Sequence, residues 1–263
     1  MQALSFDWVK NWQSRRKERR RLDKYTAAQA QLQGLSVQDA FERIYAERKW
    51  GAAPDGGAFW SGNGSRADQS VPYEDYVVRL LGRNPHFGSI VDLGCGDFQV
   101  SRRILQRVGR PIDYLGLDVV RPLIEHHVAS HSGPTTRFAV CDATQEPLPS
   151  ADLGIIRQIL QHLSNAQAVA ILDKASKAFK AVIVVESLPL IMKAPNLDMP
   201  HGATTRMALG SGICVEQPPF NLPVVEQFEA RHTEHELLRT SLVWFDRARP
   251  FDAARDGAAA SHG

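Results

Sequence analysis

Two glycines and a following aspartate stand at a spacing that suits a nucleotide-like cofactor. An apolar stretch beginning at Ile90 runs into Gly94 and Gly96, and a helical pattern begins directly after them. Glycine lets the backbone turn tightly and approach a ligand with no Cβ in the way. The N-terminus of a helix presents free N–H groups to a carboxylate or phosphate. Asp118 follows at a distance of about 20 residues, where an acidic side chain can accept hydrogen bonds from both ribose hydroxyls.

Acidic residues also stand at the ends of successive predicted strands. Asp92, Asp118 and Asp142 come at or near the carboxyl ends of three apolar segments, and this is the edge at which open α/β sheets bind ligands. A tight turn without a ligand is the alternative for the two glycines, and the three carboxylates disfavour it. A nicotinamide dinucleotide is a second alternative, but its fingerprint needs a third glycine where Gln99 stands.

Apolar strands and amphipathic helices alternate from residue 89 onward. Strands are predicted at 89–93, 113–118, 135–140, 153–157 and 181–186, and helices at 98–108, 122–129 and 165–179. This alternation predicts a parallel sheet covered by helices. Two later strands, 224–230 and 239–245, are separated by a short polar link and are expected to pair antiparallel.

The chain divides into four predicted parts. They are a basic helical extension (1–35), a helical cap with a glycine-rich lid (36–88), the main α/β domain (89–250) and a disordered tail (251–263). Within the cap, Ser36 and Asp39 form a capping-box pattern at the start of a helix. The glycine- and proline-rich stretch 51–72 predicts a loop, and the helix that follows it, 73–81, is expected to end at Gly82.

The motifs around the acidic residues resemble those of class I S-adenosylmethionine-dependent methyltransferases. Asp92-Leu93-Gly94-Cys95-Gly96 is similar to the first motif of that family, Cys141-Asp142-Ala143 to its adenine-binding segment, and Asp152-Leu153-Gly154-Ile155-Ile156 to its fourth-strand motif. Phe98 stands where many members have a third glycine. The resemblance implies a Rossmann-like, seven-stranded, mostly parallel sheet with an antiparallel last strand, and S-adenosylmethionine as the cofactor.

The resemblance also implies the residues of the cofactor site. Asp118 falls at the family's ribose-binding position, and the predicted cofactor-binding residues are Asp92, Gly94, Cys95, Gly96, Asp118, Asp142, Ala143 and Gln158. No metal site is predicted, because the three cysteines stand far apart and form no CxxC pair.

Candidate catalytic residues follow the fourth and fifth predicted strands. His162 is predicted as a general base, with a histidine bonded to the backbone as the alternative. Arg157 and Gln158 are predicted to line the pocket or to make structural hydrogen bonds, and Glu186 to orient the acceptor or to cap the next segment. Ser61–Ser65 is expected to close over the cofactor as a lid, with an ordinary glycine turn as the alternative.

The long irregular segment 188–223 is expected to form the wall of the acceptor pocket, because loops of that length in a compact domain are usually functional. Two of its residues, His201 and Arg206, either face the substrate or lie in solvent.

The predicted activity is methyl transfer to a hydroxyl of a small molecule or glycan. The glycan is suggested by the stretches 44–51, 61–65 and 218–223, which resemble uncharacterised bacterial members of the family. The alternative is a catalytically inactive, S-adenosylmethionine-binding regulatory or scaffold protein, with the basic extension as its working part. The oligomeric state is left open.

Charge is distributed unevenly along the chain. The formal net charge is +2, but residues 1–50 hold 11 Lys or Arg and 6 Asp or Glu, so the remainder is mildly acidic and nucleic-acid binding is not expected. The basic run 15–21 predicts a solvated helix face or, with Trp8 and Trp12 nearby, contact of residues 1–24 with anionic lipid. The expected location is cytoplasmic, with peripheral contact to the inner membrane face as the alternative.

Overall fold

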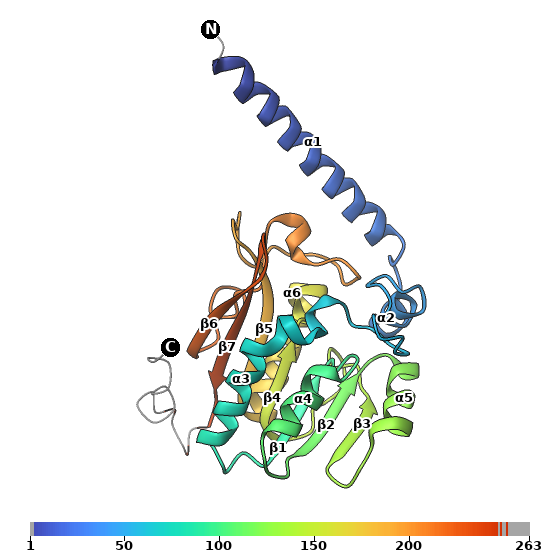
Figure 1. The fold of residues 1–263 in the computed structure, drawn as a ribbon, viewed down its shortest axis with the longest axis vertical. Helices are drawn as coiled ribbons and strands as arrows, with labels where there is room; N and C mark the ends of the chain where they lie inside the picture. The colour runs from blue at the N-terminus through green and yellow to red at the C-terminus, as the bar shows by residue number, and fades with distance from the viewer. Residues whose placement is uncertain (1–2, 247, 249–250, 252–263) are drawn as a thin grey trace.

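One mixed sheet forms the centre of the protein (Figure 1). In the computed structural model, which describes residues 3–246, 248 and 251, seven strands follow the order β3-β2-β1-β4-β5-β7-β6. The strands are β1 (Ser89–Leu93), β2 (Asp113–Asp118), β3 (Thr136–Val140), β4 (Ala151–Arg157), β5 (Phe179–Pro189), β6 (Val224–Thr233) and β7 (Glu236–Trp244). Strands β1 to β5 pair in parallel, and β7 pairs antiparallel with both β5 and β6. The predicted Rossmann-like fold class is therefore confirmed.

Helices lie on both faces of this sheet. The helices of the chain are α1 (Ala3–Ala30), which extends away from the sheet, and α2 (Val37–Ala46), α3 (Ala67–Arg83), α4 (Gln99–Arg107), α5 (Arg121–His131) and α6 (Asn165–Ala178). In Figure 1, α3 and α4 lie in front of the strands and α6 lies behind them. Successive strand residues point to opposite faces, so Ile90 packs in the core beneath α3, α4 and α5, whereas Val91 packs with α6.

Helix α3 begins earlier and ends later than the sequence predicts. It starts at Ala67 and contains both Pro72 and Gly82, residues that were expected to lie in a loop and at a helix end. Tertiary contacts explain the difference, because the buried Glu74 carboxylate accepts hydrogen bonds from Ser70 on the same helix and from Arg103 on α4. A buried, paired carboxylate holds the first turns of α3 in helical geometry despite the proline.

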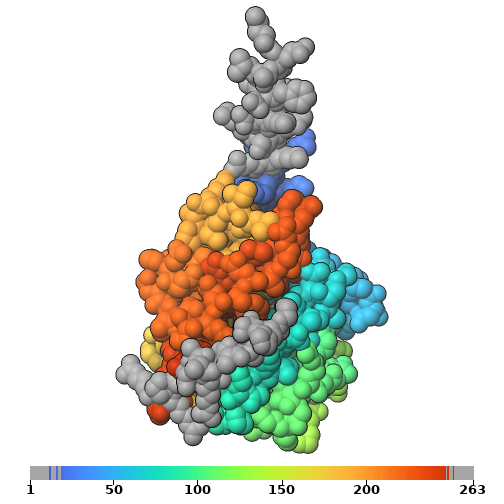
Figure 2. All heavy atoms as spheres, turned by 60° about the vertical axis from the view of Figure 1, so that its left-hand side comes forward, coloured from blue at the N-terminus to red at the C-terminus, as the bar shows by residue number. Residues whose placement is uncertain are grey.

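The other face of α3 supports the far edge of the sheet. Figure 2 shows α3, in cyan, beside the orange and red β6–β7 hairpin. The ring centroids of Tyr76 and Phe228 lie 4.9 Å apart, and the Tyr76 hydroxyl donates to Glu226 at 3.0 Å. The hairpin that the sequence predicts to be antiparallel is thus joined to the helical cap.

The N-terminal extension is helical, as predicted, and α1 projects away from the sheet (Figure 1). Its C-terminal end contacts the domain, because the Gln29 amide donates to Thr204 at 3.1 Å and Leu32 packs with Ala40 and Ile44. None of the described helices has both the length and the apolar character needed to cross a membrane. The Trp8 side chain and the tail beyond Phe251 lie outside the described residues.

The small cluster at the end of α1 gives a stability prediction. Leu32, just after α1, is 6% exposed, whereas Leu22 on α1 is 39% exposed. Leu32→Ala should lower the free energy of unfolding by about 2–3 kcal/mol through lost burial. The matched control Leu22→Ala should change it by less than about 0.5 kcal/mol. Urea unfolding of the full chain measures both values, and equal losses would show that α1 is not docked by Leu32.

Candidate functional site

A cleft of about 1060 Å³, including the part open to solvent, lies at the carboxyl ends of β1, β2 and β4. Its wall contains every residue predicted to bind the cofactor: Asp92, Gly94, Cys95, Gly96, Asp118, Asp142, Ala143 and Gln158. Two of the three predicted catalytic residues, Arg157 and His162, also line it. Parallel strands end at one edge of the sheet, so residues distant in sequence meet there.

The glycine loop after β1 comes very close to its neighbours. Gly94 and Gly96 have positive φ angles of 66° and 54°, which residues with a Cβ adopt at a cost. A Cβ built on Gly94 would lie 2.3 Å from Cγ2 of Ile159, and one on Gly96 would lie 2.5 Å from Oγ of Ser61. The loop therefore needs glycine at both positions for space as well as for backbone angle.

Asp118 holds the loop and faces the cleft. Its carboxylate accepts hydrogen bonds from the N–H groups of Gly96 at 3.1 Å and Val120 at 3.0 Å, one on each oxygen. Burial raises the pKa of Asp118, because the charged form loses hydration. Each oxygen keeps a second lone pair, so the carboxylate can still accept two hydroxyl groups, as a ribose-binding residue must.

Asp92 supports the site from below. One of its oxygens accepts hydrogen bonds from the Ser101 hydroxyl at 2.5 Å and the Tyr114 hydroxyl at 2.8 Å. Burial raises the pKa of Asp92 to about 6, although both hydroxyls oppose this rise. These bonds tie β1 to α4 and β2, so the carboxylate fixes the platform under the glycine loop.

Asp142 and Ala143 form the cleft wall after β3. Oδ1 of Asp142 accepts hydrogen bonds from the backbone N–H and the hydroxyl of Thr144, at 2.8 and 2.6 Å. These bonds orient a half-buried carboxylate whose Oδ2 remains available to a ligand. The donor and acceptor set of the cleft thus fits the cofactor predicted from the sequence.

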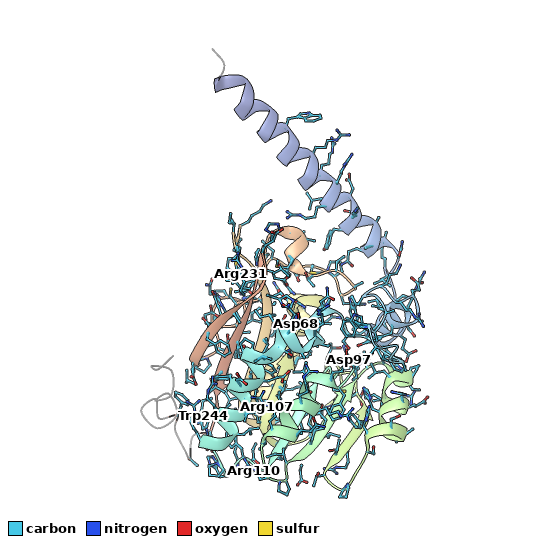
Figure 3. The ribbon with its side chains drawn as sticks, viewed as in Figure 1. Asp68, Asp97, Arg107, Arg110, Arg231 and Trp244 are labelled. Atoms are coloured by element: carbon cyan, nitrogen blue, oxygen red, sulfur yellow. The ribbon has the colours of Figure 1, made fainter. Side chains whose placement is uncertain are left out.

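The predicted lid, residues 61–65, is bonded directly to the glycine loop. The Ser61 N–H donates to Asp97 at 3.0 Å, and the Asp97 N–H donates back to the Ser61 hydroxyl at 2.8 Å. Figure 3 labels Asp97 near the end of α4 that faces α2. The Tyr45 hydroxyl on α2 lies 2.8 Å from Oγ of Ser61. Asp97, Tyr45 and Ser61 were not among the predicted cofactor residues, although Asp97 directly follows the glycine loop.

Arg157 and Gln158 contact the lid at Gly64. The buried Arg157 guanidinium donates to the Gly64 carbonyl at 2.6 Å and lies 5.4 Å from the centre of the Tyr73 ring. A Cβ on Gly64 would lie 2.0 Å from Oε1 of Gln158, so the lid backbone packs on the Gln158 amide. Both residues line the cleft and both make structural hydrogen bonds. Lining the pocket and bonding structurally, which the sequence left as alternatives, are thus not exclusive.

His162 lines the cleft together with two aromatic rings. Its ring centroid lies 5.2 Å from that of Trp50 and 6.3 Å from that of Phe41. Nδ1 lies 3.1 Å from the Gly202 carbonyl oxygen. Burial lowers the pKa of His162 to about 4, so the imidazole is neutral at pH 7. Phe41, Trp50 and His162 are called the aromatic wall below.

Glu186 and Arg206 lie behind the cleft rather than in its wall. The Glu186 carboxylate accepts hydrogen bonds from the N–H groups of Leu160 and Gln161, at 2.9 and 3.1 Å. The fully buried Arg206 donates to the carbonyl of Leu160 at 2.6 Å. Glu186 therefore caps the turn after β4, an earlier segment than the one the sequence predicts, and it does not line the cleft. Arg206 is neither solvated nor directed at the cleft.

The segment 188–223 was predicted to form the wall of the acceptor pocket, but it lies behind that wall. None of its residues lines the cleft, but its backbone carbonyls at Gly202 and Ala203 bond to His162 and to Trp50 Nε1, at 3.1 Å each. The side chain of His201 bonds Gln167 and the Leu35 carbonyl. The segment therefore orients the aromatic wall and does not itself form the pocket surface.

Comparisons with known proteins agree with this arrangement. Residues 90–181 match a family model described as a methyltransferase domain. A sequence search of curated proteins gives no match.

Solved structures similar to the chain include human N-acetylserotonin methyltransferase (16% identity, TM-score 0.43, 67% of this chain and 54% of that one). They also include an O-methyltransferase family protein from Burkholderia thailandensis (17% identity, TM-score 0.41, 65% of this chain and 55% of that one). A third is the N-methyltransferase NodS from Bradyrhizobium japonicum (14% identity, TM-score 0.45, 67% of this chain and 89% of that one). The chain spans about half the length of the first two proteins.

The buried Glu186 predicts how stability depends on pH. Burial raises its pKa from 4.5 to about 8, so between these values the folded state binds more protons than the unfolded state. Stability should therefore fall as pH rises toward 8, by up to about 1.4 kcal/mol per pH unit.

The diagnostic window is pH 6.5 to 8. Below it, His162 and His127, whose pKa values are lowered to about 4, act in the opposite direction, and Asp92 titrates near 6. Urea unfolding across this window should show the decline in the wild type and a flatter profile in Glu186→Gln. Parallel profiles would show that Glu186 is ionised at neutral pH in the folded state.

Proposed function

We propose that residues 90–181, which match a family model described as a methyltransferase domain, form a class I S-adenosylmethionine-dependent methyltransferase domain, and that the protein methylates a hydroxyl group of a small molecule or glycan. The observation that carries this proposal is the composition of one cleft. The glycine loop with Asp118 and Asp142 lines this cleft, and so does the aromatic wall. Cofactor and acceptor would meet between them.

The cleft offers a separate group to each part of the cofactor. Asp118 would accept the ribose hydroxyls, Asp142 and Ala143 would contact the adenine, and the backbone of Gly94–Gly96 would approach the methionine end. When bound, S-adenosylmethionine supplies a methyl group that is already activated by the sulfonium charge. The chain's own task is then to orient the acceptor in line with that group and to exclude water, and orientation can supply about 7–11 kcal/mol of the barrier.

The lid contacts support the exclusion of water. Ser61 is bonded to Asp97 at the glycine loop, and Gly64 to Arg157 at the end of β4. The lid is thus held at two points on either side of the cleft. Arg157 acts here as a positioning residue, because its guanidinium bonds the lid backbone.

The aromatic wall disfavours an anionic acceptor. Two aromatic rings and a neutral imidazole carry no positive charge to pair with an anion, but they suit the apolar face of a sugar or an aromatic alcohol. Backbone groups of Gly202 and Thr204 both hydrogen-bond the His162 ring. To accept the hydroxyl proton, the imidazole would have to turn one ring nitrogen from this backbone toward the acceptor. A weakly basic imidazole suffices, because an alkylated hydroxyl oxygen is far more acidic than an imidazolium ion.

A cofactor-binding regulatory or scaffold protein without catalysis is the alternative. Both functions predict binding of S-adenosylmethionine, but only the enzyme forms S-adenosylhomocysteine when an acceptor is present. Incubation with radiolabelled cofactor and a panel of monosaccharides, lipid-linked glycans, phenols and peptides separates them. Label transferred to a sugar or phenol supports the proposal, and label found only on peptide amines contradicts the hydroxyl acceptor.

The extension and the cysteines bear on where the protein acts. Trp12 and the arginines 16 and 19–21 of α1 are exposed, which supports the hypothesis of contact with anionic lipid. Sedimentation of the full chain with anionic vesicles tests this contact. Cys95, Cys141 and Cys214 are free and buried, which supports the proposed cytoplasmic location.

The ribose assignment predicts the effect of changing Asp118. Asp118→Ala should weaken S-adenosylmethionine binding by about 1–3 kcal/mol, because the ribose hydroxyls and the Gly96 N–H lose their acceptor. Asp113 stands exposed at the other end of the same strand, so Asp113→Ala is the matched control and should bind like the wild type. Calorimetry measures both. If Asp118→Ala binds as tightly as the control, the ribose lies elsewhere.

The role of His162 is tested by a variant that keeps the ring. His162→Phe should lower turnover by about 10²–10⁴-fold, the usual contribution of a general base, while cofactor affinity stays within about threefold. The wild-type rate should be flat from pH 6 upward, because the imidazole protonates only near a pKa of about 4. Full activity in His162→Phe would leave orientation as the whole mechanism.

A further inference from the structure

Three histidines gather on α5, outside the cleft. Helix α5 lies beside β3 at the edge of the sheet (Figure 1). The ring centroids of His126, His127 and His131 are 5.5–6.1 Å apart. One nitrogen from each ring can be chosen so that all three lie within 4.8 Å of one another. Nothing in the proposed methyl transfer uses these side chains.

His127 is the member whose hydrogen bonding is incomplete. The residue is 2% exposed, and its Nε2 lies 2.7 Å from the carbonyl oxygen of Gly96. Nε2 must carry the proton of that bond, so Nδ1 presents a lone pair. Among the described residues Nδ1 is buried and has no hydrogen-bond partner. A buried acceptor without a donor destabilises the folded protein unless a water molecule or an ion binds it.

We propose that His126, His127 and His131 bind a divalent transition-metal ion of the zinc class. Neutral imidazole is a preferred ligand of Zn²⁺, Co²⁺, Ni²⁺ and Cu²⁺. The carbonyl of Gly96 supplies the outer contact that metal-bound histidines usually make through their second ring nitrogen. Water would complete the coordination of the ion.

The geometry needs only a small closure. Metal–nitrogen bonds of about 2.0–2.1 Å in a tetrahedral site place the nitrogens about 3.4 Å apart. His126 is exposed and His131 is half-buried, so rotation of these two side chains can close the cluster around the fixed His127 ring. The pair His127 and His131 is separated by one helical turn, which places both rings on the same face of α5.

Charged side chains of both signs surround the cluster. The hollow beside it is lined by Asp55 and Asp97, and also by Arg102 and Arg103. The two carboxylates balance the two guanidinium groups, so the imidazoles themselves would supply the binding of the ion.

Aromatic packing alone does not account for the cluster. The His127 ring centroid lies 5.0 Å from that of Phe138, and the His131 centroid lies 5.5 Å from that of Phe98. These contacts restrict the rings, but they satisfy no lone pair on Nδ1. They instead reduce the side-chain entropy that metal binding would have to remove.

The site would be connected to the cofactor loop through one residue, Gly96. A metal on Nδ1 of His127 would polarise the Nε2–H that donates to the Gly96 carbonyl, and the N–H of Gly96 donates to Asp118. Occupancy would therefore stiffen the loop at Gly96. The proposal itself does not depend on methyl transfer, because binding can be measured without cofactor or acceptor.

The test uses the tag-free full chain, first with Co²⁺ and then with Zn²⁺. Co²⁺ should give the visible absorption of a four-coordinate site with imidazole ligands, and calorimetry with Zn²⁺ should show a single site. His126→Gln and His131→Gln should each weaken binding by at least about tenfold, while retaining the wild-type thermal midpoint without metal. His235→Gln, which removes a histidine whose side chain is 84% exposed on the β6–β7 turn, should bind like the wild type.

Two results would overturn the proposal. One is the absence of Co²⁺ and Zn²⁺ binding by the wild type. The other is binding that is equally strong in His126→Gln, His131→Gln and His235→Gln, which would place the ion elsewhere on the chain. Because His127 is buried and packed, its substitution is not needed for either comparison.

Discussion

The close approach of the glycine loop to its surroundings is the constraint on which the site depends. Gly94 presses against Ile159 after β4, and Gly96 against Ser61 of the lid, at distances that exclude a Cβ. The peptide groups of Gly96 add two directed bonds, to Asp118 on β2 and from His127 on α5. Four segments are thereby brought to one short loop, because a backbone without side chains leaves room for all of them.

Around this loop, buried polar and charged groups build the walls. Glu74 with Arg103 joins α3 to α4, Glu186 caps the turn after β4, and Arg206 holds that turn to the segment 188–223. Each of these groups is engaged by specific partners, which is the condition under which buried charge is tolerated. An exposed ion pair also joins the two helices. Figure 3 shows Arg107 between α4 and α3, where it pairs with Asp75.

Much of the cofactor half of the site could be predicted from the sequence. Gly94, Gly96, Asp118 and Asp142 follow strands that are consecutive in the chain, so local pattern and the rule for parallel sheets place them together. The lid contact was only partly predictable. Ser61 and Asp97 are far apart in sequence, and no local period indicates that their backbone and side chains bond reciprocally.

The sequence by itself determined the order and type of the main elements, because hydrophobic periodicity and turn residues act over a few positions. It also determined where the acidic strand ends lie. Only the tertiary structure decided where α3 begins, because the buried, paired Glu74 supports its first turns around Pro72, and the places of Glu186 and Arg206 behind the cleft. These outcomes depend on hydrogen bonds and ion pairs between distant segments and on the loss of hydration of the buried groups. The energies of both are set by the neighbours that pack around a side chain, and not by its position in the chain.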